Sequence, residues 1–171
     1  ILERVFSRIG GRGDCSVIGS SLKTDVRSAS LLNGVAIRAL DYNDVYWKQD
    51  PSHPSDLLSA AFCVGERENR SGKDLILATV IAYELEMRIM EAAFPGVREL
   101  GLHHATLTQF VSPVVAGKML GMNAEQITNA IGICGSHNTT LGAVTAGTLT
   151  MMKNTVDPMA TEAGVFAALI A

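Results

Sequence analysis

The fold class of this 171-residue chain is decided by the stretch Ser71-Gly72-Lys73-Asp74-Leu75-Ile76-Leu77-Ala78-Thr79-Val80-Ile81-Ala82. Ser71 followed three positions later by an acid has the pattern of a capping box, which marks the start of a helix. Apolar residues then recur at helical spacing up to Ala93. Phe94-Pro95-Gly96 ends the pattern, because proline lacks a backbone donor and glycine relaxes the backbone. The stretch therefore predicts a helix from 71 to about 93.

Helical spacing of apolar residues continues through most of the chain beyond Ser28. The expected helices are 28–40, 55–69, 71–93, 105–120, one that begins at the cap Asn123, and a last one that opens at Asp157-Pro158. In that last helix we expect Asp157 to be the N-cap and proline to hold the first helical position. The two-residue link after 120 predicts that the helices on either side pack antiparallel. Because no segment alternates as a strand does, we predict an all-α helical bundle.

The composition excludes several classes of protein. The net charge is −3 and the basic residues form no cluster, so the chain lacks the surface that binds nucleic acid. No apolar run is long enough to span a membrane, and the first residues do not form a signal peptide. The three cysteines are widely spaced without a C-x-x-C pair, which favours buried thiols in a reducing cytosol. We therefore expect a cytoplasmic protein with no nucleic-acid partner and no membrane partner.

The two ends of the sequence predict a fragment of a longer protein. Hydrophobic residues make up 47% of the chain and charged residues 18%, which is more apolar than a free-standing domain of this size needs. The chain starts abruptly at Ile1 and stops within the apolar run 164–171. Gly10-Gly11-Arg12-Gly13-Asp14 interrupts any regular element, so residues 1–27 are left without an assigned fold.

The densest chemistry lies in two short motifs, Asp41-Tyr42-Asn43-Asp44 and His53-Pro54-Ser55-Asp56. Asp41 falls where the predicted helix 28–40 ends. A carboxylate at a helix C-terminus lies in an unfavourable dipole field and needs a compensating partner. His53, twelve residues further on, is the candidate for that partner.

The chain holds four histidines, and each of them alone is more often structural than catalytic. His53, His103 and His104 lie beside predicted helix boundaries, and His137 lies at the end of a helix. Together, histidines can divide the removal and the delivery of a proton, because they titrate near neutrality. Lys153 is the one charged residue between 142 and 156. Its ammonium either reaches water or binds an anion, and the sequence favours neither.

Other kinds of site have weaker support. A metal site would compete for the same histidines and acids, but adjacent histidines usually point in different directions and no H-E-x-x-H occurs, so we expect no metal. No G-x-S-x-G elbow is present for a Ser-His-Asp triad. No G-x-x-x-x-G-K-[ST] loop is present for a phosphate group.

Taken in order, six motifs resemble the MmgE/PrpD family. They are Asn33-Gly34-Val35-Ala36, Leu40-Asp41-Tyr42-Asn43-Asp44, His53-Pro54-Ser55, Gly101-Leu102-His103-His104, Ala116-Gly117-Lys118-Met119-Leu120-Gly121-Met122 and Met152-Lys153-Asn154. The resemblance covers residues from about 28 to 171. It implies that residues 1–171 form part of the large helical domain of that fold, with a smaller α+β lid domain absent here. It also implies homodimers without a cofactor that act on small polycarboxylates.

The resemblance also assigns residues to the site. Asp41 and His53 match the family's acid and histidine, His103 or His104 matches a second histidine, and Lys153 matches a lysine. Val45 and the paired histidines depart from the decarboxylating branch, which favours dehydration by a lyase similar to 2-methylcitrate dehydratase. We add three residues as candidate substrate-binding groups, Ser55, His103 and His137.

Eliminating water from a hydroxy-polycarboxylate needs a base for the C–H proton, an acid for the hydroxyl and a cation for the carboxylates. The hypothesis is that His104 takes the proton, that His53 oriented by Asp41 protonates the leaving group, and that Lys153 pairs a substrate carboxylate. A decarboxylase of the cis-aconitate type and an epimerase of the iminodisuccinate type remain open within the family. A non-catalytic helical scaffold is the alternative outside it. We expect this chain alone to be inactive.

Overall fold

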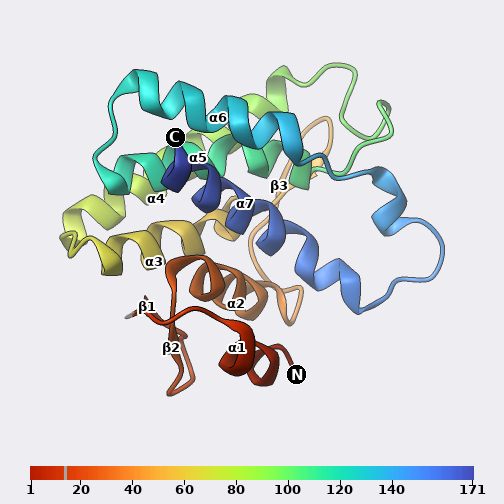
Figure 1. Cartoon of the computed structure of the whole chain (residues 1–171). Coiled ribbons are helices and arrows are strands. Elements are labelled where there is room, and N and C mark those ends of the chain that lie inside the picture. Colours follow the sequence, from red (N-terminus) through yellow and green to blue (C-terminus); the bar gives the residue numbers. More distant parts are fainter. Residues whose placement is uncertain (14) are drawn as a thin grey trace.

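The computed structural model describes residues 1–13 and 15–171, and these residues confirm the predicted helical class (Figure 1). Their seven α-helices are α1 (Leu2–Ile9), α2 (Val26–Arg38), α3 (Leu58–Arg67), α4 (Gly72–Ala92), α5 (Ala105–Leu120), α6 (Ala124–His137) and α7 (Val156–Ile170). Short 3-10 helices are η1 (Pro54–Leu57), η2 (Gly142–Thr145) and η3 (Met151–Thr155). Strands β1 (Cys15–Ser16) and β2 (Lys23–Thr24) form one antiparallel pair, and β3 (Tyr46–Trp47) and β4 (Pro51–Ser52) form another. The predicted break at 10–14 ends at Asp14, which lies outside the described residues.

Several helix boundaries follow the capping residues that the sequence predicted. The Ser71 hydroxyl accepts the Asp74 N–H, and the Asp74 carboxylate accepts the Ser71 N–H at 3.0 Å. Asn123 and Gln126 form the same reciprocal box at the start of α6. Gly121 closes α5 with φ 77°, a left-handed conformation that a side chain would strain. These boxes satisfy backbone donors that a helix start otherwise leaves unpaired.

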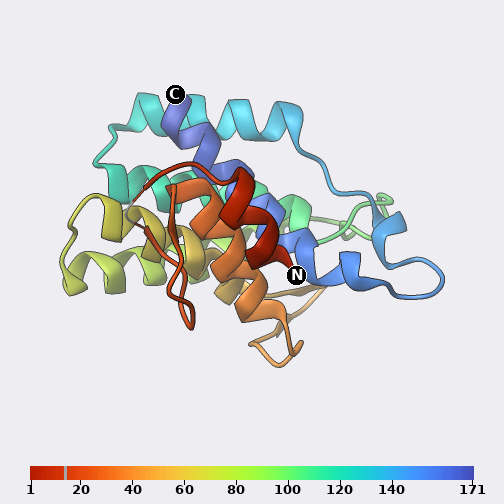
Figure 2. The same ribbon diagram turned by 60° about the horizontal axis from the view of Figure 1, so that its bottom comes forward.

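Helix α5 lies at the centre of the bundle and packs against α4, α6 and α7 (Figures 1 and 2). Helix α6 runs back along α5 after the tight turn at Gly121, which confirms the predicted antiparallel pair. Helix α7 runs in the same direction as α5, because His104 faces Asp157 and, two turns on, Ser112 faces Gly164. The two helices touch closely there: a Cβ added at Gly164 would lie 1.8 Å from Ser112 Oγ. The N-terminal ends of α5 and α7 are therefore held side by side.

Small side chains make this close packing possible. The main core cluster joins α3, α4, α5 and α7 through alanines and valines that no solvent reaches, among them Ala60, Ala78, Ala82, Val111 and Val115. Alanine keeps helix axes near each other and fills the interface without voids. The core therefore fixes the helix ends on which the polar residues lie.

Residues 1–13 and 15–25, in the part of the chain that the sequence left unassigned, lie against α2 (Figure 2). The Asp25 carboxylate accepts the N–H groups of Arg27 and Ser28, so it caps α2, and it also accepts the Gly11 N–H at 2.8 Å. From inside α2, the Asn33 amide reaches the Ser16 carbonyl at 2.9 Å. These contacts tie the first hairpin to the bundle.

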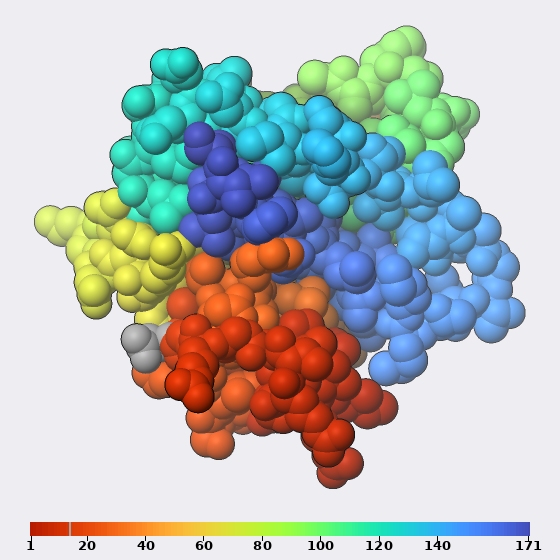
Figure 3. Space-filling model, viewed as in Figure 1, coloured from red at the N-terminus to blue at the C-terminus, as the bar shows by residue number. Residues whose placement is uncertain are grey.

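The segment between α6 and α7 projects at one edge of the molecule (Figure 3). It contains η2 and η3, and it is joined to the start of α5 where the His103 N–H donates to the Thr140 carbonyl at 2.9 Å. Among the described residues, no helix has both the length and the apolar character needed to cross a bilayer.

Candidate active site

The predicted chemical residues converge where several helices begin or end. Arg38 lies in the last turn of α2, His53 precedes η1, His104 precedes α5, and Asp157 lies in the first turn of α7. Helix ends leave backbone groups unpaired, so polar side chains are accommodated there more easily than in mid-helix. Cations near a helix C-terminus and anions near an N-terminus are also favoured by the macrodipole. The positive charge of Arg38 near the C-terminus of α2 and the negative charge of Asp157 near the N-terminus of α7 are therefore both favoured by the helix dipoles.

Arg38 is the buried cation at the centre of the cluster, with 1% of its surface exposed. Its Nη2 lies 3.4 Å from Asp157 Oδ2 and 3.7 Å from Asp41 Oδ1. Its Nη1 lies 3.7 Å from Asp56 Oδ2 and donates to Asn43 Oδ1 at 3.3 Å. A guanidinium removed from water requires anionic partners, because its desolvation penalty is large. Arg38 therefore holds together carboxylates from three separate segments.

The two buried carboxylates beside Arg38 have opposite protonation tendencies. Burial and the neighbouring Asp157 carboxylate raise the pKa of Asp56 well above its ordinary value, although Arg38 opposes them. Burial acts on Asp157 too, but the contacts with His104 and the Arg38 charge outweigh it and lower the pKa of Asp157. Like charges so close do not both ionise readily. Asp157 is accordingly the more readily ionised of the two carboxyl groups beside Arg38.

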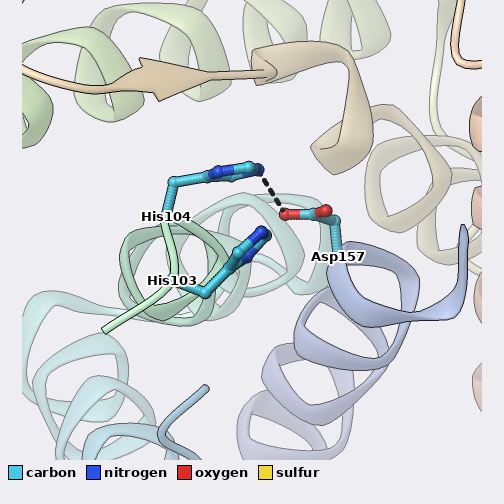
Figure 4. A group of neighbouring side chains, drawn as sticks. All are labelled: His103, His104 and Asp157. Atoms are coloured by element: carbon cyan, nitrogen blue, oxygen red, sulfur yellow. Dashed lines mark ion pairs between the residues drawn. The ribbon is translucent and has the colours of Figure 1, made fainter. Parts of the chain in front are cut away.

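Three imidazole rings lie near Asp157, with His104 in the middle. His104 Nε2 is 3.3 Å from Asp157 Oδ1, and its ring centroid is 3.9 Å from that of His103 and 5.1 Å from that of His53. Figure 4 shows His103 and His104 reaching toward Asp157 from the start of α5. His103 and His104 are buried, whereas His53 is only half-buried.

Hydrogen bonds identify which nitrogen of each outer ring carries the proton. His53 Nδ1 lies 2.6 Å from the Asp44 carbonyl, which can only accept, so Nδ1 donates and Nε2 keeps its lone pair. His103 Nδ1 accepts the Ala105 N–H at 3.2 Å, so the proton of that ring is on Nε2. Burial lowers the pKa of His53, and burial together with His104 lowers the pKa of His103 to about 4. Both outer rings are therefore neutral at pH 7.

The predicted pairing of Asp41 with His53 is wrong. The Asp41 carboxylate instead forms an ion pair with Lys153 and also contacts Arg38, while the His53 ring bonds the Asp44 carbonyl. The Lys153 hydrogen bond lowers the pKa of Asp41. The unfavourable dipole field at the helix end explains why Asp41 needs a partner, but a nearby histidine and a distant lysine can both fill that place. Lys153 and Asp41 form the partly exposed rim of the cluster.

Ser55 and His137 have different places. Ser55 Oγ accepts the Asn43 amide at 3.0 Å, so Ser55 lies beside the residues around Arg38. His137 is exposed at the end of α6, where its Nδ1 bonds the Ile133 carbonyl at 3.0 Å. His137 lines a hollow of about 440 Å³ with Gln109 and Val156. None of the other predicted site residues is among the described residues that line it.

Sequence reasoning missed Arg38 and Asp157 as members of the site. Thr155, not Asp157, is the N-cap of α7, and the helix begins at Val156 because η3 runs directly into it. The Asp157 side chain consequently turns inward to Arg38 and His104 instead of capping the backbone.

A second buried acid was also missed. Glu86 on α4 accepts the Ser52 hydroxyl at 2.5 Å and the Thr108 hydroxyl at 3.1 Å. Burial raises the pKa of Glu86 to about 7, although both hydroxyls oppose the shift. The available signal was the position of Glu86 four residues from both Ala82 and Met90, which places it on the apolar face of the helix.

Unsatisfied polar atoms concentrate in this cluster. Among the described residues, buried side-chain atoms without a well-aligned hydrogen bond belong to Arg38, Asp56, His104, Asp157, Glu86 and Gln109. Several of these atoms still have an ion-pair partner, as the Asp157 oxygens have in Arg38 and His104. A buried polar atom with no partner at all costs roughly 1–3 kcal/mol. Native proteins keep groups of this kind mainly where function requires them. The arrangement is consequently better explained by chemistry than by stability.

His103, His104 and Asp157 have the residue types of a metal site, and their ligand atoms lie within 4.8 Å of one another. Two contacts oppose such a role. The Asp157 carboxylate already faces the Arg38 cation, and the outward nitrogen of His103 carries a proton while its other nitrogen accepts the Ala105 N–H. A metal ligand must offer a lone pair. The residues fit a proton-transfer cluster better than a metal centre.

Comparisons with known proteins agree on one family. The model of the MmgE/PrpD N-terminal domain matches residues 1–171, including the first residues that the motif resemblance left out. The cis-aconitate decarboxylase-like protein oryM of Aspergillus oryzae is 30% identical over 93% of this chain and 34% of its own length. The probable 2-methylcitrate dehydratase of Saccharomyces cerevisiae is 30% identical over 67% of this chain and 24% of its own length.

The 2-methylcitrate dehydratase of Escherichia coli K12 is likewise 30% identical, over 68% of this chain and 26% of its own length. The chain thus spans about a quarter to a third of the length of the curated relatives it matches.

Proposed function

The chain belongs to the MmgE/PrpD family, and on that premise we propose that the protein containing it is a hydro-lyase that eliminates water from a small hydroxy-polycarboxylate. The proposal places the acid–base chemistry at the histidine cluster and carboxylate binding at its rim. It draws on relatives named 2-methylcitrate dehydratase. We also expect the complete protein to be a homodimer that needs no cofactor.

One observation carries the proposal: His53 is a neutral, half-buried imidazole whose Nε2 lone pair accepts no hydrogen bond from the described residues. A general base needs an unprotonated nitrogen that can reach the substrate. The Asp44 carbonyl holds the other nitrogen, so the ring cannot turn freely. His53 is therefore our candidate for the base that removes the C–H proton.

This assignment changes the roles that the sequence suggested. His104 is the base that the sequence predicts, but both of its ring nitrogens are buried, whereas His53 reaches the surface of the cluster. A base must contact its substrate, so we place His104 beneath His53 instead. The proton that His53 removes is then available for the departing hydroxyl on the same face of the substrate. A single imidazole can in this way serve as base and afterwards as acid.

Carboxylate binding falls to Lys153. Its side chain is 27% exposed and at present pairs with the Asp41 carboxylate, an anion of the same chemical kind as a substrate carboxylate. A substrate carboxylate can take the same place. Lysine binds such groups as a compact point charge.

Decarboxylation is the second candidate. The decarboxylase-like protein oryM aligns over 93% of this chain, whereas the yeast and bacterial dehydratases align over 67% and 68%. Both reactions need a placed imidazole and a cation for carboxylates. The products of the complete protein decide between the two reactions.

The test uses the complete protein, purified with and without His53→Asn. It is incubated in turn with 2-methylcitrate, cis-aconitate and iminodisuccinate, and the products are identified by mass spectrometry. We expect loss of water from 2-methylcitrate, and a fall in rate of about 10²-fold or more for H53N, within the range known for general acid–base groups. Carbon dioxide from cis-aconitate would instead establish the decarboxylase. Turnover of none of the three, or H53N with the wild-type rate, would reject the proposal.

A further inference from the structure

Asp157 is the most deeply buried anion of the cluster, and it has no surface role. Its side chain is 0% exposed, it lies in the first turn of α7, and it faces Arg38 on one oxygen and His104 on the other. Burying a charge of this kind is costly unless it is paired. Nothing in the packing of α7 requires an acid here, because alanines and valines fill the neighbouring core positions of the same helix.

The contact with His104 is polar and close. His104 Nε2 lies 3.3 Å from Asp157 Oδ1 without the alignment of a hydrogen bond. Because a carboxylate oxygen only accepts, the contact favours the tautomer in which Nε2 carries the proton. In turn, His104 lies between the other two rings, at 3.9 Å from His103 and 5.1 Å edge-on from His53. The chain of contacts runs from Arg38 through Asp157 and His104 to His53.

We propose that Asp157 is a positioning residue, held by Arg38, that fixes the ring of His104 and through it the ring of His53. This inference rests on the proposed acid–base role of His53. Asp157 touches no substrate; it acts through His104 by holding the His53 ring in place.

Asp56 provides a matched control, because it is a second buried aspartate beside the same arginine. Asp56 Oδ2 is 3.7 Å from Arg38 Nη1, and Asp56 Oδ1 accepts the Asn43 amide at 3.4 Å, but no described contact joins it to an imidazole. The raised pKa of Asp56 makes the loss of its negative charge a smaller change than the same loss at Asp157, whose pKa is lowered. Asp56→Asn therefore tests the loss of a buried carboxyl beside Arg38 without disturbing the rings.

The experiment compares Asp157→Asn and Asp56→Asn in the complete protein. For D157N we expect kcat to fall about 10- to 100-fold while KM changes less than about threefold, since positioning contributes to the transition state more than to binding. We also expect its kcat to depend on pH differently from wild type. For D56N we expect a smaller fall in kcat than for D157N, because no described contact joins Asp56 to an imidazole.

If Asp157 had only a structural role, the two variants would lose activity and stability in a different pattern. Equal losses of kcat in D157N and D56N, in proportion to equal losses of thermal stability, would overturn the proposal, and so would wild-type kinetics in D157N. If D157N does not fold, His104→Gln replaces it, because that variant keeps the Arg38–Asp157 pair. A kcat for H104Q within about threefold of wild type would then reject the proposed chain of contacts.

A second readout separates this inference from the proposed function. Selective ¹⁵N labelling of histidine in the complete protein reports which ring nitrogen is protonated, whether or not the substrate is known. D157N should move the His104 signals from a single tautomer to a mixture and broaden those of His53, whereas D56N should leave both unchanged. Unchanged His104 signals in D157N reject the inference even if the enzyme is active. Changed signals in a protein that turns over none of the three acids support the inference and reject only the proposed reaction.

Discussion

Gly164→Ala should destabilise the protein at the point where α5 and α7 touch. An alanine in a helix is ordinarily favoured over glycine by about 1 kcal/mol. At Gly164, however, the new Cβ would lie 1.8 Å from Ser112 Oγ, 2.5 Å from Ser112 Cβ and 2.8 Å from Pro113 Cδ. The hydroxyl can rotate away, but the Cβ and the proline ring cannot, so the helices must separate. Overpacking of this kind costs about 1–3 kcal/mol or more.

The expected net loss is roughly 2 kcal/mol, which for a domain of this size lowers the melting temperature by about 4–8 °C. Two other helical glycines provide a graded control. Gly132→Ala meets nothing within 4 Å and should stabilise the protein by about 0.5–1 kcal/mol. In Gly65→Ala, the new Cβ would lie 2.6 Å from the flexible end of Met119 and at an ordinary 3.9 Å from Arg70 Cβ, so the effect should be intermediate.

The assay is thermal unfolding of the complete protein together with hydrogen exchange, followed by mass spectrometry of peptides from α5 and α7. Faster exchange should appear in these two helices in G164A and not in G132A. The double variant S112G/G164A should recover part of the loss, because replacing Ser112 with glycine removes both the hydroxyl and the Cβ. Equal stability of G164A and G132A would refute the claim that backbone contact sets the spacing of α5 and α7.

Three further outcomes follow from charges and pKa values at the site. Lys153→Ala should raise KM about 10- to 100-fold, because that factor corresponds to the free energy of a lost charge-assisted contact. The control Lys73→Ala, at an exposed lysine, should leave KM unchanged. An unchanged KM in K153A would remove Lys153 from carboxylate binding. Because burial lowers the pKa of His53 and the base must be neutral, kcat/KM should decline on the acid side with a midpoint below 6.5, and a midpoint above 7 would contradict its assignment. Glu86 binds its proton more tightly in the folded state, so the stability of the wild type should fall as the pH rises from 4.5 to about 7. Glu86→Gln lacks this loss, so urea unfolding should show its stability relative to wild type growing by about 3 kcal/mol over that range. A constant difference would show that Glu86 is not buried.

The fold class could be predicted because helix signals are local. Ser71 and Asp74 form their box within a single turn, and Gly121 ends α5 by a property of its own backbone. The last helix shows the limit of such signals. Asp157 before a proline has the pattern of an N-cap, but η3 continues into α7 and the carboxylate finds a stronger partner inside the protein.

The site could be predicted by residue type but not by partner. His53, His104 and Lys153 were identified because imidazole and ammonium groups are scarce in this apolar chain, and the structure gathers them as neighbours of one cluster. Which group pairs with which depends on contacts between residues far apart, such as Lys153 with Asp41 across 112 positions. Arg38 was overlooked because an arginine in the last turn of a helix is normally at the surface.

The ion pairs around Arg38 have a consequence for how the polypeptide assembles. Helix α2 is synthesised before α3 to α6, whereas Asp157 and Lys153 lie beyond α6, so a growing chain carries Arg38 through the synthesis of these four helices without its principal counter-ion. Arrival of α7 neutralises the arginine, seats the imidazoles and closes the alanine-lined interface in a single event. Helix α7 thus completes the surroundings of Arg38, and nascent chains that stall before it should depend on chaperones.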